Sequence, residues 1–258
     1  MGGTLLRVVA LSAFGGVLSA LAASLFVALP ERSRQALVPP LVSFATGALL
    51  AAACVGLMPE AVRSAGGAGA AGVGLAAALG MVACFAIERS LLARASRASG
   101  SESRPRATGP MILWGDGLHN AVDGAAIAGA YLTHPALGVA TAIAVFAHEL
   151  PREIGDLAVL LDSGMSRLVA LSLNLLVSLA AVAGAVIACM ALAHVLWVLP
   201  YALALAAGTL LYVALADLVP GLHRKGGLGA GALQLLWMLA GIAIIWITQA
   251  GPEPGAGR

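Results

Sequence analysis

The 258-residue sequence contains few charged residues, few aromatic residues and few cysteines. Charged residues make up 10% of the chain, far below the roughly 25% of soluble domains, which excludes an ordinary soluble protein. The three cysteines, Cys54, Cys84 and Cys189, lie in separate apolar runs without a CxxC spacing, so a disulfide framework is not expected. The net charge is only +2 and the basic residues are scattered over loops, which is not the footprint of a nucleic-acid-binding protein. No P-loop motif is present, so ATP is not the energy source in this chain.

Long apolar stretches dominate the remaining composition, because 60% of the residues are hydrophobic. A transmembrane helix needs about 20 consecutive apolar residues. By this criterion we expect spans near 5–29, 38–62, 69–92, 111–132, 136–161, 167–194, 198–220 and 228–249. The sequence therefore predicts an all-α polytopic membrane protein with eight transmembrane helices, in which residues 1–258 form a single transporter-like transmembrane domain.

The first predicted span is too long for a signal-peptide core and has no convincing cleavage site, so we expect it to remain in the mature chain. The longest linker, residues 93–110, is rich in Ser, Arg and Gly and is expected to be mobile. Positive charges concentrate on the side of the membrane that holds this linker, which the positive-inside rule assigns to the cytoplasm. Both termini are then outside. The residues on the predicted cytoplasmic side are Arg32, Arg34, Arg94, Arg97, Arg104, Arg106, Arg167, Arg224 and Lys225.

A weak internal repeat supports this layout. Gly47 precedes Pro59 by the same interval as Gly208 precedes Pro220, in the segments GALLAAACVGLMP and GTLLYVALADLVP. The two segments fall in the second and seventh predicted spans, which run in opposite directions. Inverted repeats of this kind are common in secondary transporters, with the substrate site near the middle of the membrane.

Polar side chains cluster in the fourth and fifth predicted spans. The fourth contains Asp116, His119, Asn120 and Asp123. The fifth contains His148, Glu149, Arg152, Glu153 and Asp156. An ionisable group at the bilayer centre costs roughly 2.5 to 3.5 kcal/mol, so a cluster of this size requires a polar interior and a function.

Helical spacing brings these side chains onto shared faces. His119 and Asp123 are four residues apart, and Asp116 lies about one turn before them on nearly the same face. The short segment around His134 joins the two spans, so they are expected to be antiparallel neighbours. Imidazole together with carboxylate is a ligand set typical of zinc and other first-row divalent ions. Pro151 adds a freed backbone carbonyl at Ala147, which is typical of a helix that lines a cavity.

These segments resemble the ZIP family of divalent-metal transporters. HNAVDG, from His119 to Gly124, and HELPREIGD, from His148 to Asp156, are similar to the paired signatures in the family's fourth and fifth helices. FATGALLAAACVGLMPEA, LNLLVSLAA and AAGTLLYVALADLVP resemble its second, sixth and seventh helices. The resemblance implies a metal site of His119, Asn120, Asp123, His148, Glu149 and Glu153, with Arg152, Asp156, Asp116 and Asn174 modulating it.

Arg152 departs from the family pattern, in which many members have a second histidine one turn after the first. Arginine is always charged and has no lone pair for a metal. Three interpretations follow: Arg152 turns away to pair with Asp156, it occupies the site as a tethered cation, or it has ended transport. A transport-inactive metal-binding or sensing homologue therefore remains an alternative to a working transporter.

The sequence supports less specific predictions for the polar residues outside these two clusters. Asn174 and Ser178 either extend the transport path or form an interhelical hydrogen bond, and Glu60 and Asp217 lie near span ends. His134, His194 and His223 are expected in loops or at the membrane interface. Glycines between 66 and 74 permit close helix packing and are compatible with a homodimer.

The HELPR segment is one residue from the HExxH zinc-protease motif, so an intramembrane metalloprotease is the competing enzyme class. Arg152 replaces the second zinc-binding histidine of that motif, which favours a transporter over an enzyme. We therefore expect an inner or plasma membrane permease that carries a divalent cation into the cytoplasm by alternating access. Zn²⁺ is the first candidate substrate, with Fe²⁺, Mn²⁺ and Cd²⁺ as alternatives, and no permanently bound cofactor is expected.

Overall fold

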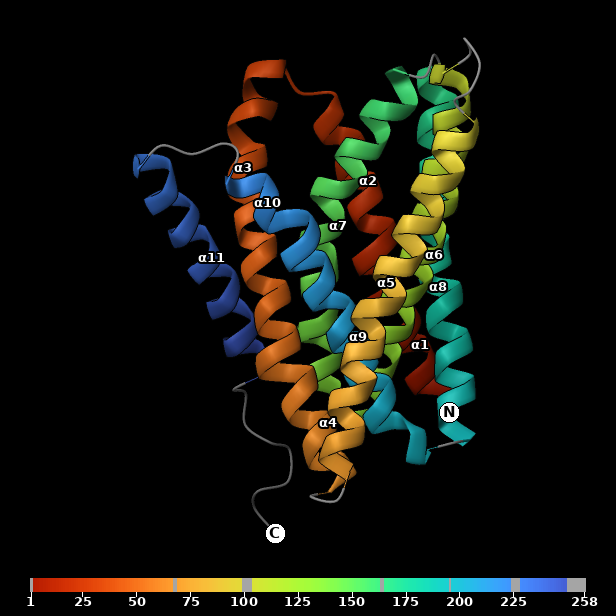
Figure 1. Ribbon diagram of the computed structural model, residues 1–258, viewed down its shortest axis with the longest axis vertical. Coiled ribbons are helices and arrows are strands. Elements are labelled where there is room, and N and C mark those ends of the chain that lie inside the picture. Colours follow the sequence, from red (N-terminus) through yellow and green to blue (C-terminus); the bar gives the residue numbers. More distant parts are fainter. Residues whose placement is uncertain are drawn as a thin grey trace.

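The computed structural model describes residues 2–66, 69–98, 104–162, 165–194, 196–223 and 228–249. Within these ranges the chain is a bundle of helices without any strand, and the long helices run along one axis of the molecule (Figure 1). The helices are α1 (Gly2–Ser12), α2 (Leu18–Val27), α3 (Glu31–Ala51), α4 (Met58–Ala65), α5 (Ala70–Ala98), α6 (Arg104–Thr133), α7 (Pro135–Asp162), α8 (Arg167–His194), α9 (Leu199–Tyr212), α10 (Val219–His223) and α11 (Leu228–Gln249). A short 3₁₀ turn, Leu196–Val198, precedes α9.

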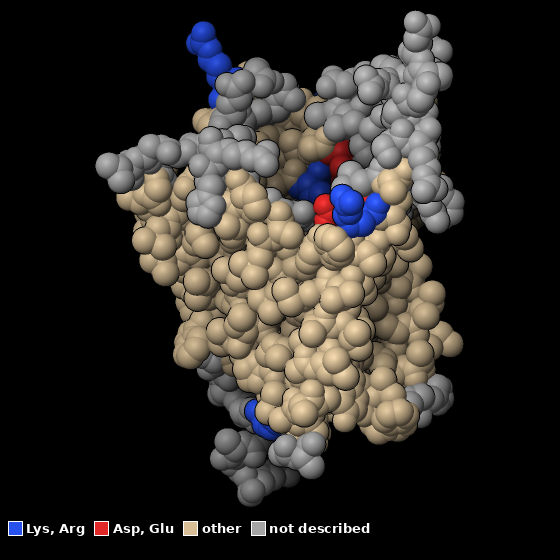
Figure 2. Space-filling view, in the orientation of Figure 1, with Lys and Arg blue, Asp and Glu red and all other residues tan. Residues whose placement is uncertain are grey.

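Six stretches of the described chain are long and apolar enough to cross a membrane. They are Gly2–Val27, Ala36–Ala65, Ala70–Ser90, Arg167–Leu192, Leu199–Ala216 and Gly231–Gln249. Figure 2 agrees with this reading, because the broad middle of the face it shows carries no charged side chain. The predicted all-α, polytopic membrane class is therefore confirmed, while the count of eight spans stays a prediction. The two remaining long helices, α6 and α7, carry the polar clusters.

Helices α5 and α6 extend into the segment that the sequence predicts as a linker, residues 93–110. The first continues to Ala98 and the second begins at Arg104, so both sides of this segment are helical. Residues 99–103, at its centre, lie outside the described residues. At the other end of α6 the predicted short connection is present, since only His134 separates α6 from α7.

Glycines on two helix pairs let backbones come into close contact. A Cβ atom on Gly47 of α3 would lie 2.0 Å from the carbonyl oxygen of Met238 on α11. A Cβ atom on Gly208 of α9 would lie at the same distance, 2.0 Å, from the carbonyl oxygen of Ala77 on α5. Only glycine permits such an approach, because any side chain would collide with the neighbouring backbone.

Two further glycines make the reciprocal contacts on the same helix pairs. A Cβ atom on Gly241 would lie 2.2 Å from the carbonyl oxygen of Phe44, and one on Gly80 would lie 2.2 Å from that of Leu205. The residues of the α5–α9 pair and those of the α3–α11 pair are separated by one constant interval in the sequence. The predicted inverted repeat thus has a structural counterpart in two helix pairs packed in the same way.

The repeat also extends to a local change of helix type. A π-helical turn, Ala52–Leu57, follows α3, and a second one, Val213–Leu218, follows α9. Each turn begins at the same distance beyond its glycine, Gly47 or Gly208. Wide turns of this kind are frequent at functional positions in helices.

The apolar core lies among α3, α4, α7 and α9 and consists largely of small residues, so the helices pack closely. Helix α6 packs against α8 and α7, and α7 also packs against α2 and α3. This arrangement holds α6 and α7 side by side inside the bundle. Their polar faces therefore point toward each other instead of toward lipid.

Candidate metal centre

Four side chains from α6 and α7 converge on one point. Asp123 and His119 come from α6, and His148 and Glu149 come from α7. One ligand atom of each lies within 4.8 Å of the others. Three of the four residues are buried and His119 is partly exposed. We refer to these residues as the four-ligand cluster.

The separations within the four-ligand cluster are those of a tetrahedral site. His119 Nε2 and His148 Nε2 are 3.3 Å apart, and His148 Nε2 lies 3.0 Å from Asp123 Oδ2 and 3.2 Å from Glu149 Oε1. His119 Nε2 lies 3.7 Å from Asp123 Oδ2 and 3.6 Å from Glu149 Oε1. Ligand atoms held at about 2.0 Å from a tetrahedral zinc ion are roughly 3.3 Å apart. These five separations therefore bracket the edge length of such a tetrahedron.

The ring of His148 is oriented by its own helix. Its Nδ1 atom lies 3.1 Å from the carbonyl oxygen of Ala144, one turn earlier. When Nδ1 carries the proton and donates to this carbonyl, Nε2 keeps its lone pair and faces the cluster. Asp123 Oδ2 then receives no proton from His148, and this buried oxygen has no hydrogen-bond partner among the described residues. A bound cation would satisfy both atoms.

Arg152 lies beside the four-ligand cluster and shares Glu149 with it. Its Nε atom donates to Glu149 Oε1 at 2.9 Å, and one terminal nitrogen donates to Glu149 Oε2 at 2.8 Å. The same terminal nitrogen forms an ion pair with Asp116 of α6. The other is 3.8 Å from Asp156 Oδ2, at the limit of an ion pair. The ion pair with Asp156 that the sequence offered as one alternative is therefore present, but Asp116 and Glu149 lie closer to the guanidinium.

A second group of carboxylates adjoins the first. Asp116, Glu149 and Glu153 place one oxygen each within 4.8 Å of the others, and all three are buried. Asn174 of α8 donates to Glu153 through its Nδ2 atom. We refer to Asp116, Glu149 and Glu153 as the acidic cluster. Asn174 thus forms the interhelical hydrogen bond that was one of its two predicted roles.

Asn120 and Ser178 are buried near these groups but have local partners. Asn120 Nδ2 donates to Asp116 Oδ1 at 2.8 Å and to the backbone oxygen of Asp116 at 3.1 Å. Its Oδ1 atom has no hydrogen-bond partner within the part of the chain that the structure describes. Ser178 donates to the backbone oxygen of Leu175 in its own helix at 2.9 Å. Neither residue belongs to the four-ligand cluster, and Asn120 instead holds Asp116 of the acidic cluster.

A cavity of about 220 Å³ reaches the four-ligand cluster from one end of the bundle. His119, Asp123 and Arg152 line it, together with residues of α5 and α9 that include Glu88 and Tyr212. Tyr212 donates a hydrogen bond to Glu88 across the two helices. Figure 2 shows a hollow near one end of the molecule in which acidic and basic side chains gather.

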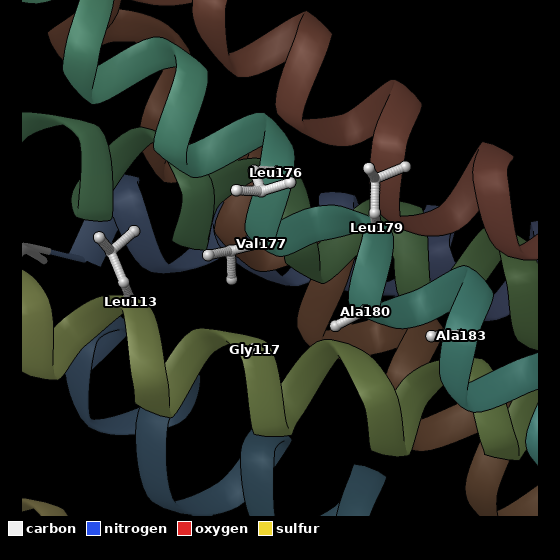
Figure 3. A pocket seen from close by; sticks show the side chains of 7 residues that line it. All are labelled: Leu113, Gly117, Leu176, Val177, Leu179, Ala180 and Ala183. Atoms are coloured by element: carbon white, nitrogen blue, oxygen red, sulfur yellow. The ribbon is translucent and has the colours of Figure 1, made fainter.

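Two other hollows do not reach the cluster. A polar one of about 270 Å³, lined by Glu60, Arg63 and His134, lies at the opposite end of α7. Glu60 pairs there with Arg63. An apolar hollow of about 540 Å³ lies between α6 and α8, and residues such as Leu113 and Leu176 line it (Figure 3). The side chains of Asp217, His194 and His223, all considered in the sequence, lie outside the described residues.

Comparison with known proteins identifies the family. The family model described as ZIP Zinc transporter matches residues 93–249, more than half of the chain. The chain belongs to the ZIP family. The matched region includes both helices of the four-ligand cluster. The predicted family resemblance is therefore confirmed.

Curated relatives agree with this assignment. The chain is 42% identical over 142 residues to zinc transporter ZIP10 of Danio rerio, 41% over 136 residues to zinc transporter foi of Drosophila melanogaster and 41% over 146 residues to zinc transporter ZIP4 of Homo sapiens. These matches cover 52%, 52% and 50% of this chain but only 17%, 19% and 22% of the relatives. This ZIP chain therefore aligns with about a fifth of the length of the relatives.

Family membership decides between the two classes that the sequence left open. ZIP family members are transporters and not enzymes, so the metalloprotease alternative loses its basis. Membership and the apolar helices together make the chain an integral, multi-pass membrane protein. The paired signature segments of the resemblance, HNAVDG and HELPREIGD, each contribute ligand atoms to the four-ligand cluster.

Proposed function

We propose that this ZIP chain carries a divalent cation, in the first place Zn²⁺, across the membrane through the four-ligand cluster of His119, Asp123, His148 and Glu149. The observation that carries the proposal is the set of five separations between 3.0 and 3.7 Å, which suit tetrahedral zinc. Two carboxylates balance the charge of one divalent ion. Two imidazole nitrogens favour a first-row metal such as zinc over magnesium or calcium, which prefer oxygen ligands.

The proposed path is open on one side of the cluster and closed on the other. The cavity lined by His119 and Arg152 gives access from one end. On the opposite side of the cluster, the part of α7 that precedes His148 is buried in the apolar core. Its buried residues include Ala140, Ala144 and Ala147. This asymmetry supports alternating access, in which the apolar contacts open while the cavity closes.

The distribution of basic residues indicates the direction in which the ion is transported. The open cavity lies in the half of the bundle that contains the ends of α5 and α7 near residues 98 and 162, which the positive-inside rule assigns to the cytoplasm. The described conformation is then inward-facing, and the ion moves into the cytoplasm. The same rule puts both termini outside and suits an inner or plasma membrane. In Figure 1, α1 begins and α11 ends toward the end of the molecule at which α4 lies.

Helices α6 and α7 complete the proposed eight spans as the fourth and fifth. Their length, 30 and 28 residues, is sufficient to cross a bilayer. Their charged residues contact one another in the bundle interior, so the cost of charge facing lipid does not arise. A homodimer remains a prediction, based on the close helix packing that the glycines between 66 and 74 permit.

Zinc uptake by liposomes that contain the purified chain tests this function. Replacing His119, Asp123 or His148 by Ala should lower uptake by roughly tenfold or more, since each removes one of four ligands. His134→Ala is the matched control, because this histidine lies at the far end of α7 and outside the cluster. Uptake that is unchanged in all three cluster variants would contradict the proposed site.

The same liposome assay distinguishes a working transporter from a transport-inactive homologue. The inactive alternative is still considered because Arg152 forms ion pairs beside the four-ligand cluster. A working transporter should accumulate zinc with saturable kinetics. An inactive metal-binding homologue should bind zinc in detergent, lose that binding in His148→Ala, and yet give no uptake above protein-free liposomes. Parallel uptake of Fe²⁺, Mn²⁺ and Cd²⁺ ranks the ions.

A further inference from the structure

Two helix pairs beside the metal centre, α6–α8 and α5–α9, are each packed very closely. In the α6–α8 pair, a Cβ atom on Gly124 would collide with the carbonyl oxygen of Ala181, and one on Gly184 would lie 2.0 Å from that of Ala121. The α5–α9 pair has the reciprocal glycine contacts described above. The two pairs contact each other far less than the helices within each pair do. A seam therefore separates two closely packed pairs.

An apolar groove of about 470 Å³ lies along this seam and is lined by all four helices. Eight of its fifteen lining residues are alanine or glycine, whose side chains are too small to close the space between the pairs. Leu79 of α5 and Leu205 of α9 also line it and are 53% and 42% exposed, so the groove opens on the outer surface of the bundle. We refer to this space as the interpair groove.

The chemistry of the walls decides what can occupy the interpair groove. Of the side chains that line it in the described part of the chain, only that of Tyr201 has a polar atom. A buried water molecule needs two or more polar partners, so water is not stable there. An empty groove would leave its wall atoms without dispersion contacts on one side. Because the chain is an integral membrane protein, the apolar groups that reach the groove are the acyl chains of the bilayer.

One end of the interpair groove lies at the level of the lipid headgroups. Val198 and Tyr201 line this end, and Trp197 beside them is 75% exposed. These residues lie where one apolar span ends at Leu192 and the next begins at Leu199. Trp and Tyr are enriched at the membrane–water interface, because their rings are apolar and carry one polar group. A lipid at this position can place its headgroup beside the two aromatic rings and one chain in the groove.

The other end of the interpair groove reaches the cavity of the metal centre. Gly129, whose Cβ position lies 3.7 Å from the side chain of Leu192, is near the headgroup end. Val122 lines the groove seven residues earlier on α6, which is about 10 Å deeper along the bundle. Val122 also lines the cavity that reaches the four-ligand cluster. The deep end of the groove is therefore next to that cavity.

We propose that the interpair groove holds one acyl chain of a membrane phospholipid, which enters beside Trp197 and Tyr201 and ends against Val122. The chain fills the seam between the two helix pairs and forms the bilayer side of the wall around the metal cavity. Lipid binding at this place does not depend on whether the chain transports an ion, so the inference goes beyond the proposed function.

Photolabelling of the full-length chain in phosphatidylcholine liposomes tests the proposal. A small fraction of the lipid carries a diazirine at the end of one acyl chain, and mass spectrometry locates the label after illumination. We expect label on α6 between Val122 and Gly129. Within this segment only Val122 and Ala125 are partly exposed, and both line the interpair groove. Label on the exposed Leu235 and Leu239 of α11 provides the reference for ordinary lipid contact.

Two variants fill the interpair groove from different walls. Ala125→Leu on α6 and Ala202→Leu on α9 should each lower the label on this α6 segment by roughly fivefold or more, relative to α11, because the larger side chain takes the space of the acyl chain. Ala83→Leu is the matched control, since it makes the same change at an exposed position of α5 that does not line the groove. It should leave the labelling unchanged.

The labelling pattern of the unsubstituted chain decides the question even if a filling variant does not fold. Absence of label between Val122 and Gly129, with α11 labelled, would overturn the inference. Label confined to Val122 would place the acyl chain in the metal cavity instead, and it would also contradict the proposal. Equal labelling of the α6 segment in folded Ala125→Leu, Ala202→Leu and Ala83→Leu would do the same. Zinc uptake is measured separately, so failure of the proposed function remains distinguishable.

Discussion

The close glycine contacts between helices make a quantitative prediction about Gly47 and Gly208. An alanine Cβ at either position would lie 2.0 Å from a backbone carbonyl oxygen of the neighbouring helix. An acceptable carbon–oxygen contact is about 3.3 Å, so the two helices must separate by roughly 1.3 Å. Such a shift weakens dispersion contacts along the whole interface. Overpacking costs about 1 to 3 kcal/mol, and the rigid backbone on both sides puts these sites at the upper end.

The matched control is Gly74→Ala in α5, where nothing lies within 4 Å of the added atom. Alanine in an open helix position is neutral or stabilises by up to about 1 kcal/mol. Thermal unfolding of the detergent-purified variants measures the difference. A loss of about 3 kcal/mol corresponds to a midpoint roughly 6 to 12 °C lower for a chain of this size.

The two glycines also test the inverted repeat. Because Gly47 and Gly208 occupy equivalent contacts, on the α3–α11 and α5–α9 pairs, their alanine variants should lose similar stability. If Gly47→Ala or Gly208→Ala unfolds at the same temperature as Gly74→Ala, the described helix separations are incorrect. A large effect at one glycine alone would refute the equivalence of the two pairs.

Three further predictions concern the path, the topology and the support of the site. Modification of Cys84 by a bulky thiol reagent should slow zinc uptake, because this residue lines the cavity that reaches the four-ligand cluster, and Cys84→Ala should make uptake insensitive to the reagent. In a chain without other cysteines, Ser64→Cys should react with an impermeant external reagent whereas Ser166→Cys should not; the reverse labelling would invert the proposed direction. Asn174→Ala should lower zinc affinity several-fold in a binding assay, because Glu153 loses its donor, and an unchanged affinity would assign Asn174 to packing alone.

Local helical spacing made most of the four-ligand cluster predictable. His119 and Asp123 share a face because they are four residues apart, and the short connection at His134 forces α6 and α7 to be antiparallel neighbours. Long apolar runs similarly gave the membrane class. Both properties depend on residues that are close together in the sequence, so they can be predicted from the sequence of one chain.

The partner of Arg152 was harder to predict, because it depends on the packing of two helices. The sequence offered Asp156, one turn along the same helix, as one possible partner, but a guanidinium can also reach a neighbouring helix. Asp116 lies on the facing side of α6, and its carboxylate is 1% exposed. An unpaired buried charge is far costlier than an exposed one, so the buried Asp116 takes the guanidinium in preference to the more exposed Asp156.

The shared carboxylate of Glu149 connects the metal site to this ion pair. Glu149 Oε1 lies 3.2 Å from His148 Nε2 and also accepts a hydrogen bond from Arg152 Nε at 2.9 Å, so a change at either partner alters the other. A divalent ion bound at the histidines would compete with Arg152 for Glu149, and Asp116 would then balance more of the guanidinium's positive charge. Because Asp116 belongs to α6 and Glu149 to α7, ion binding would redistribute attraction between the two helices. Movement of these helices relative to each other is the step that alternating access requires.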